Sequence, residues 1–119
     1  MALFRITPAP TFQAEVALVV PGQAEPFKLT VTFRHHGKKA FDAMVEAAAA
    51  REKAGEPLEP AEWIAKLVVD WGPEVVDTRD EPVPFSVANL ATLLDNYPAA
   101  FYEFNAAYGR ALVEARAKN

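Results

Sequence analysis

The sequence predicts an α+β domain in which an N-terminal antiparallel β-hairpin packs against about four α-helices, with the helices dominant. Apolar and polar residues alternate in two early segments, and apolar residues recur at helical spacing after residue 37. Breaks rich in proline and glycine separate these segments. With 119 residues, the chain can bury one modest core. We therefore expect a single domain over residues 1–119, with the hairpin at about 12–35 and the helical part at about 38–118.

The hairpin is predicted from two segments with a period of two residues. One face of the first segment carries Phe12, Ala14, Val16, Leu18 and Val20. One face of the second carries Phe27, Leu29, Val31 and Phe33, opposite Lys28, Thr30, Thr32 and Arg34. Residues 21–26 lie between them and contain two prolines and a glycine, which favour a turn. Because two strands alone are only marginally stable, helices must cover the apolar face.

Two helices are predicted between residues 38 and 71. The first has the apolar stripe Phe41, Met44, Val45 and Ala48, and Gly55 with Pro57 ends it. The second begins near Pro60, a proline in a first helical turn, and Gly72-Pro73 ends it. Its broad stripe comprises Trp63, Ile64, Leu67, Val68 and Trp71.

An ordered loop over residues 74–84 is expected to lead into two further helices. Ser86 can cap the third helix, and Phe85 before it can contact Leu90 one turn later. The buried stripe of the third helix comprises Leu90, Leu93 and Leu94. Asn96-Tyr97-Pro98 then starts a last helix that runs from about Pro98 to Lys118. Its apolar positions are Phe101, Phe104, Tyr108, Leu112 and Ala115.

Gly109 lies in the middle of this last predicted helix. Glycine costs a helix roughly 1 kcal/mol relative to alanine. Its presence therefore predicts either close packing at this position or a tolerated defect.

Composition excludes several classes of function. A net charge of −4 and a pI near 5.1 argue against nucleic-acid binding, which relies on Lys and Arg neutralising phosphates. The chain has no cysteine, so no disulfide or thiol chemistry is expected, and a reducing cytosol is the natural compartment. We expect neither a signal peptide nor a membrane span, because the longest apolar runs are far too short.

No set of residues predicts a catalytic, cofactor or metal site. His35 and His36 are adjacent and point to opposite sides of a strand, so they would not share a metal ion. Ser86 lacks the Gly-x-Ser-x-Gly surroundings of a nucleophile and is better placed as a cap. We therefore expect a non-enzyme.

One enzymatic alternative stays open in and next to the loop over residues 74–84, which we call the acidic loop. It requires a concave pocket that holds at least two of Asp70, Asp77, Asp80 and Glu81. Solvated loop carboxylates, together with Glu74, are the expected arrangement. An exposed, divergent arrangement would remove the alternative.

Two tyrosines are the candidate protein-interaction residues. Tyr97 and Tyr102 both lie off the stripe that runs from Phe101 to Leu112. Tyrosine is enriched at protein interfaces because its ring is apolar and its hydroxyl is polar. We expect both side chains to be exposed and to contact a partner protein.

With these features the chain resembles the tail assembly chaperones of long-tailed, lambda-like bacteriophages. The resemblance covers the C-terminal half well and the hairpin more loosely. It is carried by Trp63-Ile64, Trp71-Gly72, the entry Glu81-Pro82-Val83-Pro84-Phe85-Ser86, Leu90 to Leu94, Asp95-Asn96-Tyr97-Pro98, Tyr108 and Leu112.

The resemblance implies a chaperone of the host cytoplasm that is absent from the finished virion. It implies binding to the tape-measure protein and the tail-tube protein, and leaves self-association open. It further implies a C-terminally extended form made by minus-one ribosomal frameshifting. Ala117-Lys118-Asn119 is compatible with the slippery heptamer A AAA AAC. The alternative is a structural tail or connector component of the virion.

Overall fold

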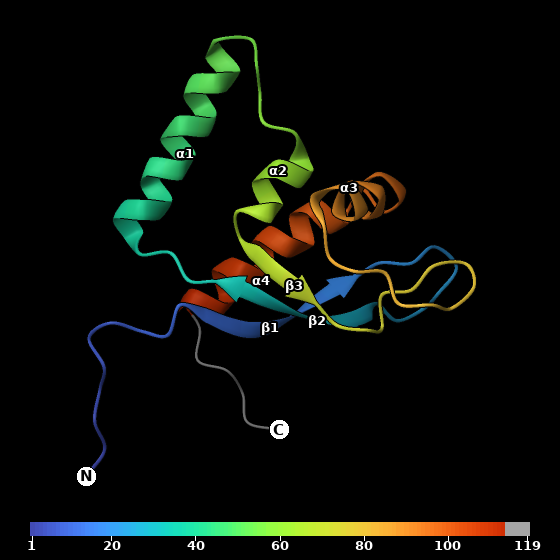
Figure 1. Cartoon of the computed structure of the whole chain (residues 1–119), viewed down its shortest axis with the longest axis horizontal. Helices are drawn as coiled ribbons and strands as arrows, with labels where there is room; N and C mark the ends of the chain where they lie inside the picture. Colours follow the sequence, from blue (N-terminus) through green and yellow to red (C-terminus); the bar gives the residue numbers. More distant parts are fainter. Residues whose placement is uncertain (114–119) are drawn as a thin grey trace.

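The structure is a computed structural model that describes residues 1–113, and it consists of a three-stranded sheet and four helices (Figure 1). The expected end of the last helix, with Ala115, and the Ala117–Asn119 codon prediction lie outside the described residues. The elements in order are β1 (Thr11–Leu18), β2 (Phe27–Arg34), α1 (Lys38–Lys53), α2 (Pro60–Ala65), β3 (Val68–Trp71), α3 (Val87–Asn96) and α4 (Ala100–Val113). The predicted α+β class is confirmed.

The predicted hairpin forms with a regular antiparallel register. Thr11 pairs with Arg34 at one end of β1 and β2, and Leu18 pairs with Phe27 at the other. Gly22 in the connecting turn has a φ of +87°, a conformation that glycine adopts without the steric cost of a Cβ atom. One face of the hairpin is buried through Ala14, Val16, Leu18, Leu29, Val31 and Phe33. Period-two alternation therefore identified the core face correctly.

A third strand, β3, replaces the end of the predicted second helix. The helix α2 ends at Ala65, and β3 pairs antiparallel with β2. Phe33 pairs with Val68 and Thr32 pairs with Asp70, so Val69 is an extra residue on β3. This bulge puts both Val68 and Trp71 in the core. Their spacing of three residues imitates a helical stripe, which is why the helix prediction was wrong for residues 68–71.

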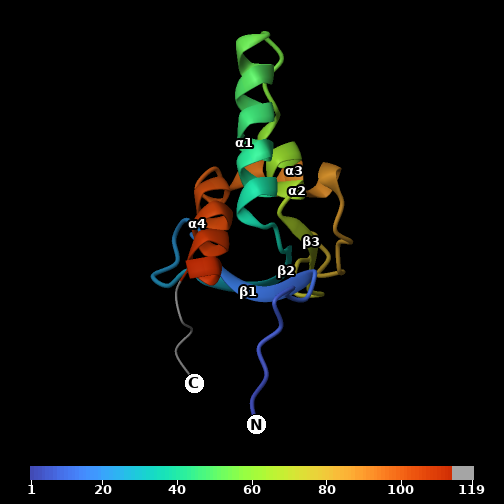
Figure 2. The ribbon, with the colours of Figure 1, turned by 90° about the vertical axis from the view of Figure 1, so that its left-hand side faces the viewer.

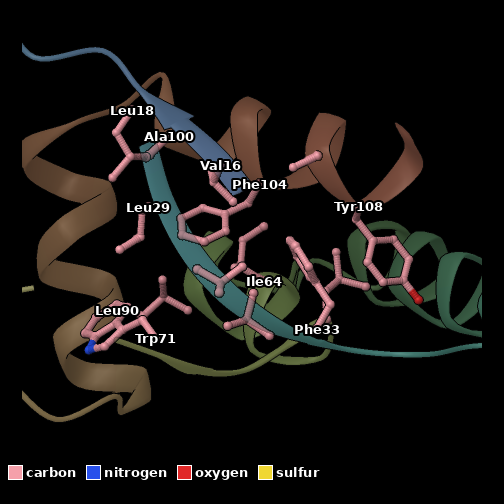
Figure 3. Close-up of a cluster of buried hydrophobic side chains, with 14 of the residues drawn as sticks. Val16, Leu18, Leu29, Phe33, Ile64, Trp71, Leu90, Ala100, Phe104 and Tyr108 are labelled. Atoms are coloured by element: carbon pink, nitrogen blue, oxygen red, sulfur yellow. The ribbon is translucent and has the colours of Figure 1, made fainter. Parts of the chain in front are cut away.

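The core lies between the sheet and the helices α2, α3 and α4. Figure 3 shows Val16 and Leu29 from the strands, Ile64 from α2, Leu90 from α3 and Phe104 from α4 in one cluster of side chains. The same five side chains are all 0% exposed. Trp71 closes one end of the core, where its indole Nε1 donates a hydrogen bond to the carbonyl oxygen of Val83 (2.8 Å).

Tyr108 joins α4 to the end of β2. Its hydroxyl donates to the carbonyl oxygen of Arg34 (2.9 Å) and accepts from the backbone N–H of His36 (3.0 Å). The Tyr108 ring packs against Phe12, Phe33 and Phe41, with centroid distances between 5.4 and 6.0 Å. Burial raises the pKa of the Tyr108 hydroxyl, and the hydrogen bond from the His36 N–H opposes this rise only in part. Because the pKa is raised overall, the hydroxyl stays protonated at neutral pH.

The helix α1 forms over the predicted residues but projects from the body (Figures 1 and 2). It contains no buried residue. Phe41 attaches its first turn to the core, since the Phe41 ring stacks on Tyr108 and meets Trp63 edge-on. Beyond Met44, the predicted stripe continues with the exposed Val45 and the half-buried Ala48. Beyond its first turn, α1 therefore remains largely solvent-exposed.

The starts of α2 and α3 are stabilised by their own caps. Glu59 and Glu62 form a capping box at α2, with Pro60 at the first helical position. Ser86 caps α3, as predicted, through its Oγ, which accepts from the N–H of Asn89 (3.0 Å). Phe85 meets Trp71 edge-on at 5.0 Å, so it attaches the start of α3 to β3.

We predict that Tyr108→Phe lowers the free energy of unfolding by about 1–3 kcal/mol. The substitution keeps the ring but leaves the Arg34 carbonyl and the His36 N–H without this partner. Urea denaturation followed by circular dichroism measures the change. Tyr102→Phe is the matched control, because Tyr102 is exposed and the loss of its hydroxyl should change stability by less than about 0.5 kcal/mol. Equal stability of the two variants would contradict the structural role of the Tyr108 hydroxyl.

We also predict that Gly109→Ala stabilises the protein by up to about 1 kcal/mol. A Cβ atom at Gly109 meets nothing within 4 Å, so the glycine is a tolerated defect and close packing does not explain it. The reverse change at the exposed Ala106 of α4, Ala106→Gly, should cost a similar amount. Thermal denaturation compares both variants with the original chain. A lower melting temperature for Gly109→Ala would show that the position is sterically constrained.

Candidate functional site

The two candidate tyrosines lie in different surroundings. Tyr102 on α4 is 72% exposed, as expected for an interaction residue. Tyr97, between α3 and α4, is half-buried and packs against the hydrophobic core. The two side chains line separate grooves, and only Tyr102 has the exposure that the sequence predicted for both. Their part in partner binding stays a prediction.

Tyr102 borders the larger groove, which we call the helical groove. Its volume is about 790 Å³. It is built from the start of α2, one face of α3, the α3–α4 connection and the start of α4. The lining residues are Glu59, Pro60, Ala61, Glu62, Val87, Ala88, Ala91, Leu94, Asp95, Pro98, Phe101 and Tyr102.

The apolar part of the helical groove combines small and aromatic side chains. Ala88 and Ala91 are exposed on α3, and Val87 beside them is 49% exposed. Phe101 and Tyr102 meet edge-on with a centroid distance of 5.5 Å. Such a surface exposes apolar area that water solvates poorly, while the aromatic rings offer a large contact area.

The charged residues of the helical groove are all acidic. Glu59 and Glu62 are engaged with each other's backbone in the capping box, where the N–H of Glu59 donates to Oε1 of Glu62 (2.9 Å). Asp95 is exposed in the last turn of α3, a turn without any basic residue. A carboxylate there faces the negative end of the helix dipole, which is an unfavourable position.

Tyr97 borders a smaller groove of about 220 Å³ at the end of the hairpin. The side chains around it are almost all apolar and come from the sheet, the acidic loop and α3. They are Leu18, Val20, Phe27, Leu29, Glu74, Val75, Val76, Leu93 and Tyr97. Phe27, which the sequence placed on the buried face, is 43% exposed here because it lies at the start of β2. A third groove of about 270 Å³ separates α1 from Leu58 and Lys66.

Within residues 1–113, the carboxylates proposed for catalysis do not share any of the three grooves. Asp70, Asp77, Asp80 and Glu81 are all exposed, and none of them lines the three grooves. Oδ1 of Asp77 accepts hydrogen bonds from the N–H groups of Arg79 (2.8 Å) and Glu81 (3.1 Å), so this carboxylate stabilises the turn. The geometry of these described residues therefore gives the enzymatic alternative no support.

In the histidine pair, His36 makes a contact that is structural. Nε2 of His36 lies 2.8 Å from the carbonyl oxygen of Lys66, which connects the residues after β2 to the C-cap residue of α2. Within residues 1–113 there is no group of three or more side chains suited to hold a metal ion.

Sequence reasoning missed most of the helical groove. The missed residues include Val87, Ala88 and Ala91, because the prediction for α3 was based on its leucine stripe. A signal was present, since these three apolar positions have helical spacing and lie outside that stripe. An α3 that is apolar on a second face needs a second covering element or a partner.

No helix in the described part of the chain has the length and apolar character needed to cross a membrane.

Comparison with known proteins identifies the family. No curated protein and no solved structure gives a significant match. The model of one family, described as phage tail assembly chaperone, matches residues 1–119, which is the whole chain. The chain therefore belongs to the phage tail assembly chaperone family.

Proposed function

We propose that this chaperone binds the phage tape-measure protein, keeps it soluble and assists assembly of the tail tube around it. The observation that carries the proposal is the match of the family over all 119 residues. Membership of this family supports a role in tail assembly and phage tail proteins as partners. The tape-measure protein and the tail-tube protein are the specific partners we propose.

The surface of the domain is compatible with reversible binding of an aggregation-prone client. Its grooves are lined mainly by apolar residues, while the net charge of −4 disfavours association of the chaperone with itself at neutral pH. A partly polar interface of modest size suits a client that must later be released. Protein binding without catalysis is therefore the activity we propose.

The place of action we propose is the cytoplasm of the infected host, and we expect the mature virion to lack the protein. We also propose that a minor extended form arises by minus-one frameshifting at the codons of Ala117-Lys118-Asn119. Reading the gene tests the second point. A gene without a slippery heptamer in these codons would exclude the extended form by this route.

Mass spectrometry of purified particles separates the proposal from the alternative of a structural tail or connector component. We predict that the chain is missing from the particles, since an assembly chaperone leaves before completion. A structural component would instead occur in a fixed ratio to the tail-tube protein. Detection of the chain at that ratio would replace the chaperone proposal by the structural alternative.

Co-expression provides the direct test of client binding. We predict that the tape-measure protein from the same phage is mostly insoluble alone and becomes soluble with this chain, because exposed apolar segments are then covered. The two proteins should also elute together in a pull-down with a tag on the chaperone. An unrelated acidic protein of similar size serves as control. A tape-measure protein that stays insoluble and unbound would contradict the proposed function.

We predict that Tyr102→Ala weakens tape-measure binding about tenfold while the circular dichroism spectrum stays native. Exposed tyrosines often contribute strongly to interfaces, and Tyr102 contributes little to the core. Phe4→Ala is the control, because it removes an exposed aromatic ring ahead of β1. Tyr97→Phe tests the second candidate without emptying its half-buried site. Undiminished binding by both the Tyr102 and the Tyr97 variants would refute the assignment of these residues.

A further inference from the structure

We propose that the helical groove, lined by α2, α3 and α4, binds an amphipathic α-helix of the client whose apolar stripe is bordered by Lys or Arg. The inference rests on the proposed function, because it takes the tape-measure protein as the source of that helix. It adds the site, the conformation of the bound segment and its charge pattern.

The apolar floor of the helical groove fits the stripe of a helix. Val87, Ala88 and Ala91 form one continuous face on α3, since Ala91 lies four residues after Val87 and three residues after Ala88. The small alanine side chains let another helix approach closely, and Phe101 with Tyr102 forms an aromatic wall beside them. The volume of about 790 Å³ lies within the range of well-formed ligand pockets, about 300–1,000 Å³, so several large apolar side chains fit.

The backbone around the helical groove favours a helix over an extended strand. All but Glu59 and Pro98 of its twelve lining residues lie within α2, α3 or α4, so the walls of the groove are helical. The groove therefore offers no sheet edge to which a strand could add. An extended segment would bury unpaired N–H and C=O groups against an apolar floor, whereas a helix satisfies its own.

The acidic charge around the helical groove favours a client helix with Lys or Arg beside its apolar stripe. Its charged residues are Glu59, Glu62 and Asp95, and none of its twelve lining residues is Lys or Arg. Within residues 1–113 the one ion pair joins Lys38 to Asp42 on α1, so these three carboxylates have no cationic partner there. Asp95 also opposes the dipole of α3. A cation brought by the client would relieve that repulsion, which makes charge complementarity part of the recognition.

A second copy of the chain is the competing occupant. Its α1 is a projecting helix that carries four cations, Lys38, Lys39, Arg51 and Lys53, and the exposed Val45. However, Lys38 already pairs with Asp42 at 2.7 Å, and α1 also carries the carboxylates of Asp42, Glu46 and Glu52. Its charge therefore matches the acidic groove less well than a helix with basic flanks only.

Two synthetic peptides test the charge pattern. Both are amphipathic helices about five turns long with the same leucine stripe, one with Lys and one with Glu beside the stripe. Fluorescence anisotropy measures their binding to the full chain at low and high salt. We expect the Lys peptide to bind at least about tenfold more tightly at low salt, and this preference to shrink as salt screens the charges. Equal binding of both peptides, or a preference for Glu, would overturn the charge argument.

Two variants of the chain test the location. Ala91→Gln fills the floor of the groove with a good helix former, and Asp95→Lys reverses one rim charge at a position where the α3 dipole favours a cation. We expect each to weaken binding of the Lys peptide about tenfold without unfolding the protein. The controls are Ala106→Gln, exposed on α4 and outside the grooves, and Glu46→Lys, with the same charge change on α1. Groove variants that bind like their controls would refute the inference.

Pull-down of the tape-measure protein with the same variants separates this inference from the proposed function. Loss of the tape-measure protein by Ala91→Gln but not by Ala106→Gln supports both. If the original chain, Ala91→Gln and Ala106→Gln all bind the tape-measure protein equally, the proposed function stands and the groove assignment is overturned. No binding even by the original chain contradicts the proposed function, and the peptides then decide the groove separately. A dimer in sedimentation that Ala91→Gln makes monomeric would assign the groove to a second copy and overturn the inference.

Discussion

The architecture depends on the contact of Tyr108 with the end of β2. The Tyr108 hydroxyl bridges the backbone of Arg34 and His36, while its ring packs among Phe12, Phe33 and Phe41. The contact therefore attaches α4 to both strands of the hairpin and to the first turn of α1. The hairpin needs such a cover, because two strands alone are only marginally stable. The same contact also positions the chain where it leaves β2, just before the projecting helix begins.

The cover that stabilises the sheet also creates the binding surface. Burial of Phe104 and Ala107 on one face of α4 leaves Tyr102 on the solvent side. Trp63 of α2 donates to Oδ1 of Asn105 (2.9 Å), which ties α2 to α4 and holds two walls of the helical groove together. The residues of the groove thus lie on helices that the core orients, so a partner would meet a largely preformed surface. Pre-organisation of this kind lowers the entropic cost of binding.

Much of the fold was predictable, because its elements are specified by local patterns. Alternation identified the hairpin and its buried face, Gly37 and Gly55 bracketed α1, and Ser86 was correctly recognised as the cap of α3. The prediction was wrong at β3, where the bulge at Val69 gave Val68 and Trp71 the spacing of a helix. The groove was hardly predictable, since Glu59, Asp95 and Tyr102 are distant in sequence and become neighbours only when the helices pack. Tyr97 shows the same limit, because its half-burial results from packing against the core.

The sequence by itself determined the α+β class, the hairpin, most helix boundaries, the acidic charge and, through the full-length family match, the link to phage tail assembly. These properties depend on residues close together in the chain or on the composition as a whole. The tertiary structure alone decided which apolar residues remain exposed, where α1 stands, and that three carboxylates surround one apolar groove. The physical reason is that exposure depends on which distant segment covers a side chain. Val87 and Leu90 lie on the same helix, yet only the packing of the core leaves the first half-exposed and buries the second completely.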